Sequence, residues 1–218
     1  MRVLFVFAHP DDAEIYSGGL IAKLYKKKFD FRVCCVKNKQ DEDRITQIRK
    51  KEFFESMKKV EVEPDLMDIK DGKIIWSDDE IEKIRNYIYK IDPYLIVTHN
   101  NLDYHADHRQ VSELVHRIAS YRYPIIMADT LCGNMNEPRY YCNITKYMNL
   151  KIDMLKCYES QILQCDYIGI VKILNSFRAL QYTGRSEGYY EAYCCANTYH
   201  SKDNDERIFK LFRDEEQI

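Results

Sequence analysis

Two short segments of the sequence hold the side chains best suited to bind a metal ion and move protons. They are His9-Pro10-Asp11-Asp12, near the N-terminus, and His105-Ala106-Asp107-His108, in the middle of the chain. Histidine and aspartate are typical zinc ligands, and a catalytic zinc takes three protein ligands and keeps a fourth position for water. Because bound water ionises near neutral pH, it becomes a usable nucleophile. The residue types therefore predict a metal-dependent hydrolase.

The two segments also contain a group for each remaining role in hydrolysis. Two histidines and one aspartate would complete the ligand set. One aspartate is then left as a base, and one histidine is left to polarise a carbonyl or protonate a leaving nitrogen. Taken one by one, the same residues have plainer interpretations. Asp11 or Asp12 is a common type of helix N-cap, and His105 and His108 fit a solvated loop.

Each segment follows a predicted strand. The continuous apolar run Val3–Ala8 is typical of a strand buried on both faces and ends at His9. Tyr94–Thr98 predicts a second strand shortly before His105. In open α/β sheets, sites form beyond the carboxyl ends of the strands. We therefore expect both segments on one rim of the sheet, which favours a shared metal site over the separate interpretations.

Strands and helices alternate along the first part of the chain. Apolar residues at helical spacing predict helices after Gly18-Gly19 and within residues 45–57, 81–91 and 111–118. Ser77 and Glu80 form a capping-box pattern at the start of the third of these helices. This alternation predicts an α/β fold with a mostly parallel sheet and helices on both faces. Further strands are predicted at Phe31–Val36, Leu66–Ile69 and Pro124–Met127.

The pattern is looser after about residue 130. The later elements that we predict are a helix over residues 150–163, a strand at Tyr189–Ala196 and a terminal helix or frayed end at residues 206–218. A turn at Asp71-Gly72 also predicts a hairpin into residues 73–76.

Composition limits the classes of protein to which the chain can belong. Its 218 residues, 45% of them hydrophobic, fit a single domain over residues 1–218. The net charge of -2, with both signs mixed along the chain, gives no field that would attract nucleic acid or anionic lipid. A homo-oligomer is compatible with these properties, so the oligomeric state stays open.

The cysteines and the N-terminus indicate a cytoplasmic protein. Adjacent pairs such as Cys34-Cys35 and Cys194-Cys195 lie in strand-like runs, and the sequence has no Cys-x-x-Cys. Buried free thiols in a reducing compartment are therefore expected. Met1–Ala8 is too short for a signal peptide with a cleavage region, and no later segment is apolar enough to cross a membrane.

Several motifs of the chain resemble those of a known family. Ala8-His9-Pro10-Asp11-Asp12-Ala13-Glu14, followed by Gly18-Gly19, resembles the signature of the LmbE/PIG-L family of zinc-dependent N-deacetylases. His105-Ala106-Asp107-His108-Arg109 resembles that family's second signature, usually His-Pro-Asp-His. Three weaker matches are Arg49-Lys50-Lys51-Glu52, Lys151 with Ser160-Gln161, and Tyr190-Glu191-Ala192-Tyr193.

The resemblance implies a Rossmann-like sheet and removal of an N-acetyl group from a glucosamine-type sugar or sugar conjugate. It also implies roles for residues at matching motif positions. His9, Asp12 and His108 would bind zinc, although such a ligand set also accepts other divalent ions. The remaining roles are Asp11 as the general base, His105 as the general acid or oxyanion stabiliser, Asp107 as the residue that orients His105, and Arg49 as a substrate contact.

Two departures from the family pattern bear on the site. Ala106 replaces the usual proline, and Tyr104 stands where some members carry an arginine. Residues 130–150 and 165–190 match no pattern that would identify the sugar. Other functions stay open: a catalytically inactive metal- or sugar-binding protein on the same fold, or a hydrolase of another amide bond. A two-metal phosphoesterase is less expected, because the sequence shows no bridging carboxylate cluster.

Overall fold

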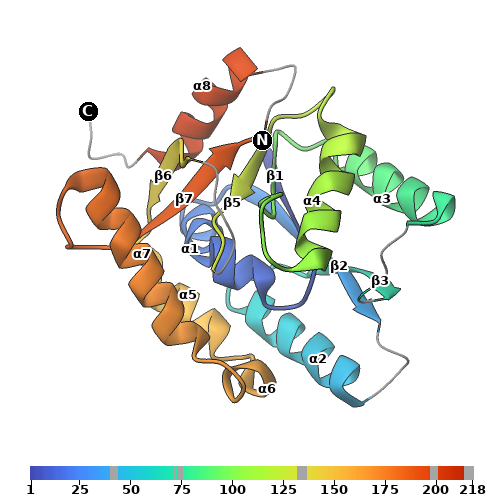
Figure 1. The fold of residues 1–218 in the computed structure, drawn as a ribbon, viewed down its shortest axis with the longest axis horizontal. Helices are drawn as coiled ribbons and strands as arrows, with labels where there is room; N and C mark the ends of the chain where they lie inside the picture. Colours follow the sequence, from blue (N-terminus) through green and yellow to red (C-terminus); the bar gives the residue numbers. More distant parts are fainter. Residues whose placement is uncertain (40–43, 71, 73–75, 132–136, 197–200, 214–218) are drawn as a thin grey trace.

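A mostly parallel sheet runs through the molecule (Figure 1). The computed structural model describes residues 1–39, 44–70, 72, 76–131, 137–196 and 201–213. In this described part the strands form one seven-stranded sheet, in the order β3-β2-β1-β4-β5-β7-β6. The strands are β1 (Arg2–Phe7), β2 (Asp30–Lys39), β3 (Asp65–Lys70), β4 (Leu95–Thr98), β5 (Ile125–Ala128), β6 (Tyr140–Asn143) and β7 (Tyr190–Cys195).

The pairing of the strands confirms the predicted α/β class. Strands β1 to β5 pair in parallel with their neighbours, while β7 is antiparallel to both β5 and β6. Parallel neighbours need crossover connections, and helices supply them here. Because β1 is central, its carboxyl end and that of β4 lie next to each other at the rim where the two histidine-containing segments begin.

Alternate side chains of β1 point to opposite faces, and both faces are covered by helices. Val3, Phe5 and Phe7 belong to one buried core, whereas Leu4 and Val6 belong to the other. The first core includes side chains from α1 (Asp12–Lys26), α2 (Arg44–Lys58), α5 (Met148–Leu155), α7 (Tyr167–Thr183) and α8 (Ser201–Phe212). The second includes side chains from α3 (Asp78–Ile91) and α4 (Ala106–Ala119). This arrangement explains the fully apolar sequence of β1.

Apart from the expected hairpin at residues 71–76, the predicted strands and helices up to residue 128 are present, and the Ser77–Glu80 capping box forms as expected. The predicted helix over residues 150–163 is instead two helices, α5 and the short α6 (Glu159–Ile162). The helical conformation is interrupted at Tyr158, whose buried hydroxyl donates to Glu14 at 2.6 Å. This tertiary contact, and not the helical spacing of the apolar residues, determines where the first helix ends. Residues 73–75 of the expected hairpin and 214–218 of the expected tail lie outside the described residues.

Three elements were not predicted: the edge strand β6, the single 3₁₀ turn η1 (Thr145–Tyr147) and helix α7. The terminal helix α8 is present, but it begins before the expected start. Cysteines of the described residues are free thiols, and four of them are buried, namely Cys34, Cys35, Cys142 and Cys194. None of the helices in the described part of the chain combines the length and apolar content that crossing a bilayer requires.

Candidate active site

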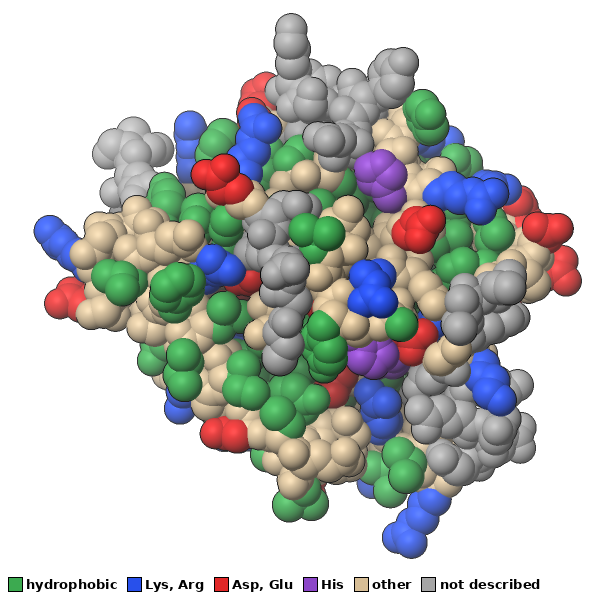
Figure 2. Space-filling view, in the orientation of Figure 1, with side chains coloured by type: hydrophobic (Ala, Val, Ile, Leu, Met, Phe, Trp, Pro, Cys, Tyr) green, Lys and Arg blue, Asp and Glu red, His purple; other side chains and the backbone are tan. Residues whose placement is uncertain are grey.

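The two histidine-containing segments meet at the carboxyl edge of the sheet. His9–Asp12 connects β1 to α1, and His105–His108 forms the start of α4. A pocket of about 630 Å³ opens between them. In the space-filling view, histidine, acidic and basic side chains come together near the middle of one face (Figure 2). The pocket is lined by His9, Asp11, Asp12, Tyr16, Arg49, Lys70, Gly72, Tyr104, His105, Asp107, His108, Leu131, Gln161 and Tyr167.

The turn from β1 into α1 fixes its side chains by local hydrogen bonds. The backbone N–H of His9 donates to the Asp12 carboxylate at 2.7 Å, and the N–H of Asp12 returns to the His9 carbonyl at 3.3 Å. Between them, Asp11 has a φ of 101°. An L-residue rarely adopts this conformation, and strain of this kind is concentrated at functional sites. The turn thus places Asp11 and Asp12 on the same pocket wall.

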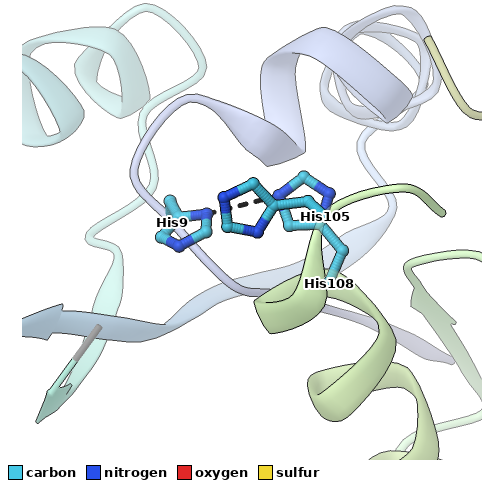
Figure 3. Close-up of side chains that lie close together, drawn as sticks. All are labelled: His9, His105 and His108. Atoms are coloured by element: carbon cyan, nitrogen blue, oxygen red, sulfur yellow. Dashed lines mark hydrogen bonds between the residues drawn. The ribbon is translucent and has the colours of Figure 1, made fainter. Parts of the chain in front are cut away.

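Four potential ligand atoms from three residues lie close together: two imidazole nitrogens and both oxygens of one carboxylate. His9 Nδ1 lies 3.2 Å from Asp12 Oδ2 and 3.3 Å from His108 Nε2, and His108 Nε2 lies 3.3 Å from Asp12 Oδ1. Figure 3 shows the rings of His9 and His108 approaching from different elements. Ligand atoms at zinc–nitrogen bond lengths around a tetrahedral ion are about 3.3 Å apart. His9, Asp12 and His108, called the triad below, could therefore hold one metal ion. Among the described residues, the groups His9-His105-His108 and Asp12-His99-His108 also bring possible ligand atoms within 4.8 Å of one another.

The charges around the triad favour a bound cation. Burial opposes a charged imidazole, yet hydrogen bonds to Asp107 and Asp12 raise the pKa of His9 to about 9. Burial likewise opposes charge on His108, but the Asp12 charge and a contact with Asp103 raise its pKa to about 10. Asp12 keeps a pKa well below its usual value despite burial, because His108 and His99 lie beside it. The carboxylates of Asp12, Asp103 and Asp107 thus surround the two imidazoles with negative charge.

Further groups surround the triad and hold its rings. Asp103 Oδ2 lies 3.2 Å from His108 Nδ1, on the side of the ring away from the pocket centre. His99 stacks on His108 with 3.9 Å between ring centroids, and its Nε2 accepts the backbone N–H of Ala8 at 2.9 Å. Carboxylates and packed rings behind metal-binding histidines set their orientation. His99 also lies within reach of the site, since its Nε2 is 3.2 Å from Asp12 Oδ2 and its ring could hold a cation together with Asp12 and His108.

Asp11 and Arg49 share the pocket wall beside the triad. An Arg49 Nη2 atom lies 3.5 Å from Asp11 Oδ1 and donates to the Pro10 carbonyl at 3.2 Å. Burial and the neighbouring Asp12 charge raise the pKa of Asp11 to about 7, with Arg49 opposing that rise. A carboxylate with a raised pKa in a pocket has the properties of a general base.

His105 begins α4 and faces the pocket from the other wall. Its Nδ1 accepts the backbone N–H of Asp107 at 3.2 Å, so a neutral ring carries its proton on Nε2. This differs from the expected link between Asp107 and His105, because the contact runs through the backbone. The Asp107 carboxylate turns toward β2 instead, where it meets Lys37, the Gly72 N–H and His9.

The structure thus brings together all seven residues that the sequence singled out: His9, Asp11, Asp12, Arg49, His105, Asp107 and His108. Sequence reasoning missed Asp103, Lys37 and Tyr167, whereas Gln161 belongs to one of the weaker motif matches. Asp103 and Lys37 could have been identified as candidate site residues, because both lie just beyond or at the end of an apolar strand, as His9 does. Tyr167 begins α7, whose position follows from no local pattern.

Residues of the three weaker motifs form hydrogen bonds with one another or with α1. Glu52 accepts hydrogen bonds from the backbone N–H and hydroxyl of Ser160, at 2.8 and 2.6 Å. Lys151 donates to Glu191 at 2.7 Å, and Glu191 accepts the N–H groups of Gly19 and Leu20 in α1. These contacts fasten α5, α6 and β7 to the helices that carry the site.

A family model matches just over half of the chain. It is described as "PIG-L: GlcNAc-PI de-N-acetylase" and covers residues 4–119. This span includes both histidine-containing segments and Arg49, whereas α5 to α8, β6 and β7 lie beyond it.

Similar solved structures share the fold at low sequence identity. The hydratase GalB, a 4-carboxy-2-hydroxymuconate hydratase from Pseudomonas putida KT2440, has a TM-score of 0.76 and 18% identity, over 90% of this chain and 96% of that chain. An N,N'-diacetylchitobiose deacetylase from Pyrococcus horikoshii has a TM-score of 0.74 and 19% identity, over 89% and 83%. A deacetylase of teicoplanin biosynthesis has a TM-score of 0.71 and 17% identity, over 90% and 99%.

Proposed function

Because the chain belongs to the PIG-L family, we propose that it is a metal-dependent N-deacetylase. Its substrate would be an N-acetylglucosamine-type sugar or sugar conjugate, and zinc its metal. The observation that carries the proposal is the triad: its two imidazole nitrogens lie 3.3 Å from each other and 3.2–3.3 Å from oxygens of the Asp12 carboxylate, in a pocket that also holds a further carboxylate and a further imidazole. Two structural neighbours that are deacetylases add support.

In this proposal the triad holds the metal ion. His9 would bind through Nδ1 and His108 through Nε2, since these atoms face each other and Asp12. The bound metal supplies Lewis acidity, which activates water and polarises the acetamide carbonyl. Asp12 would contribute one carboxylate oxygen, while its other oxygen keeps the N–H of His9.

The other pocket residues divide the proton transfers. Asp11 would accept the proton of the attacking water, because it lines the pocket beside the triad and has a raised pKa. His105, with its proton on Nε2, would stabilise the developing oxyanion and protonate the leaving amine. Arg49 is positioned to hold Asp11 and to contact a sugar hydroxyl or phosphate.

The fold alone does not select this reaction, since one neighbour of similar TM-score is a hydratase. The decisive experiment is a panel of N-acetylated sugars and conjugates with zinc-loaded protein, read by release of free amine. We expect turnover of at least one acetamide. No amine from any of them would favour a metal- or sugar-binding protein on the same fold.

Asp11→Asn tests the assignment of the base. We expect the variant to bind zinc with nearly the wild-type affinity, while amine release falls by about 10²–10⁴-fold. The matched control is Glu113→Gln, which neutralises an exposed carboxylate on α4 outside the pocket and should retain full turnover. Full turnover by Asp11→Asn would show that another group removes the proton.

A further inference from the structure

A buried ammonium group lies behind the pocket. Lys37 is on β2 and is fully buried. Its Nζ donates to Asp107 Oδ1 and, at 2.9 Å, to Gln110 Oε1, and it lies 5.1 Å from the centroid of the Trp76 ring. A charge is costly to bury unless it is paired and hydrogen-bonded. Lys37 is paired here with a residue of the site, although it is not among the residues that line the pocket.

The contact with Lys37 restricts the orientation of the Asp107 carboxylate. While Oδ1 accepts from Lys37, Oδ2 accepts the backbone N–H of Gly72 at 3.0 Å and lies 3.3 Å from His9 Nε2. A carboxylate with both oxygens engaged cannot rotate freely. Its Oδ2 therefore stays beside His9 Nε2 and favours the ring form that carries a proton there.

The orientation of His9 follows from this contact. With its proton on Nε2, a neutral His9 presents the lone pair of Nδ1 to His108 Nε2 and Asp12, 3.3 and 3.2 Å away. We infer that Lys37 is a positioning residue, which acts through Asp107 to hold His9 in its metal-binding orientation and so increases the affinity of the triad for its ion. This inference rests on the proposed metal centre.

A second buried lysine provides a matched control. Lys23, on α1, is also fully buried, and its Nζ donates to the Phe212 carbonyl at 2.6 Å. It does not line the pocket. Lys23→Met therefore measures what the loss of a buried ammonium does to the whole molecule, whereas Lys37→Met also releases Asp107.

The experiment measures Zn²⁺ affinity by competition with a chromophoric chelator, together with the visible spectrum of the Co²⁺-loaded protein. Removal of a group that supports a metal ligand weakens binding by about 10–100-fold. We expect this loss, and an altered Co²⁺ spectrum, for Lys37→Met but not for Lys23→Met. Lys37→Gln, which removes the charge but keeps a donor, should fall between wild type and Lys37→Met, and it takes the place of Lys37→Met if that variant does not fold.

A double variant tests whether Lys37 acts through Asp107. If it does, Lys37→Met combined with Asp107→Asn should bind zinc no more weakly than Asp107→Asn alone. The inference is overturned if the two effects multiply, or if Lys37→Met binds zinc as tightly as wild type. A wild-type protein that binds neither Zn²⁺ nor Co²⁺ overturns the metal centre itself, so the two failures are distinguishable.

Discussion

Helix α1 contacts two buried clusters of charged side chains, and their polar atoms are satisfied in different ways. At the middle of the helix, Glu191 accepts four hydrogen bonds, from the N–H groups of Gly19 and Leu20, from Lys151 and from the Tyr193 hydroxyl, at 2.7–2.9 Å. Lys151 is held in addition by Asn175 at 3.1 Å. The positive charge that balances the Glu191 carboxylate thus comes from the protein itself.

At the N-terminus of the same helix, the triad is arranged the other way. Its two imidazole nitrogens and the oxygens of Asp12 converge, with distances of 3.2–3.3 Å between them, where the Glu191 cluster places a lysine. A buried arrangement of this kind is stable when a cation occupies its centre. The difference shows how a structural ion pair can be distinguished from a candidate metal site: the former is balanced by a lysine, whereas the latter gathers acceptors around a common point.

The largest effect is expected from removal of the internal cation. Lys151→Met leaves the Glu191 carboxylate buried without its charged partner, a change that typically costs about 3–5 kcal/mol of stability. Urea unfolding at neutral pH measures this cost. The control, Lys156→Met, removes a lysine from an exposed pair with Asp153 and should cost less than about 1 kcal/mol. Equal effects of the two variants would contradict the assigned role of the Glu191 cluster.

A similar effect is expected when a metal ion is supplied to the triad. Zinc at about 1,000 times its dissociation constant should stabilise the wild-type protein by about 4 kcal/mol, because the ion binds the folded state. Thermal unfolding with and without chelator measures the gain. His108→Ala should abolish it, whereas His116→Ala, on the last turn of the same helix, should retain it. A zinc response in His108→Ala would place the metal elsewhere.

Glu14 is a further buried carboxylate of α1, and its two oxygens are hydrogen-bonded to different extents. One of its oxygens accepts from Ser56 and Tyr158, at 2.5 and 2.6 Å, while Oε2 has no hydrogen-bond partner among the described residues. Burial raises its pKa from 4.5 to about 7. The folded state therefore keeps a proton that the unfolded chain releases, so this contribution to stability is complete below pH 4.5 and is lost as the pH rises to about 7.

Glu14→Gln should remove this pH dependence while keeping the shape of the side chain. At pH 8 the metal-free variant should be more stable than wild type by up to about 3 kcal/mol, and at pH 4.5 the two should be nearly equal. Urea unfolding in the presence of chelator, at both pH values, provides the measurement. The exposed variant Glu55→Gln is the control. Parallel stability profiles for wild type and Glu14→Gln would contradict the raised pKa.

The smallest effect concerns the packing of α1 between the clusters. A Cβ at Gly19 would lie 2.6 Å from three carbons of the Ile144 side chain, whereas one at Gly18 would lie 2.9 Å from Cγ of Lys151. Gly19→Ala should therefore cost about 1–3 kcal/mol by overpacking. Gly18→Ala should cost less, because its Cβ would meet one carbon at 2.9 Å rather than three at 2.6 Å. Thermal unfolding compares the stabilities of the two variants. A larger loss for Gly18→Ala than for Gly19→Ala would show that the Ile144 side chain can move aside.

Much of the fold and both site segments could be predicted from local patterns. The apolar run of β1 and the helical spacing in α3 and α4 identify buried strands and amphipathic helices, because burial demands those periodicities. The rim position of the two segments then follows from the parallel order of the strands. Helix α7 was not predicted, since it carries apolar residues on several sides, including the exposed Ile173 and Phe177.

The sequence by itself determined the residue types of the triad, the strand ends that carry them and the crossover helices that follow. The tertiary structure alone decided which charged groups meet: Lys37 with Asp107, Lys151 with Glu191, and Glu52 with Ser160. Each pair joins residues far apart in the chain, and a local pattern contains no information about such partners. Their pairing depends on how the helices pack on the sheet, and that packing separates the Glu191 cluster, balanced by its own lysine, from the triad of converging metal-binding atoms.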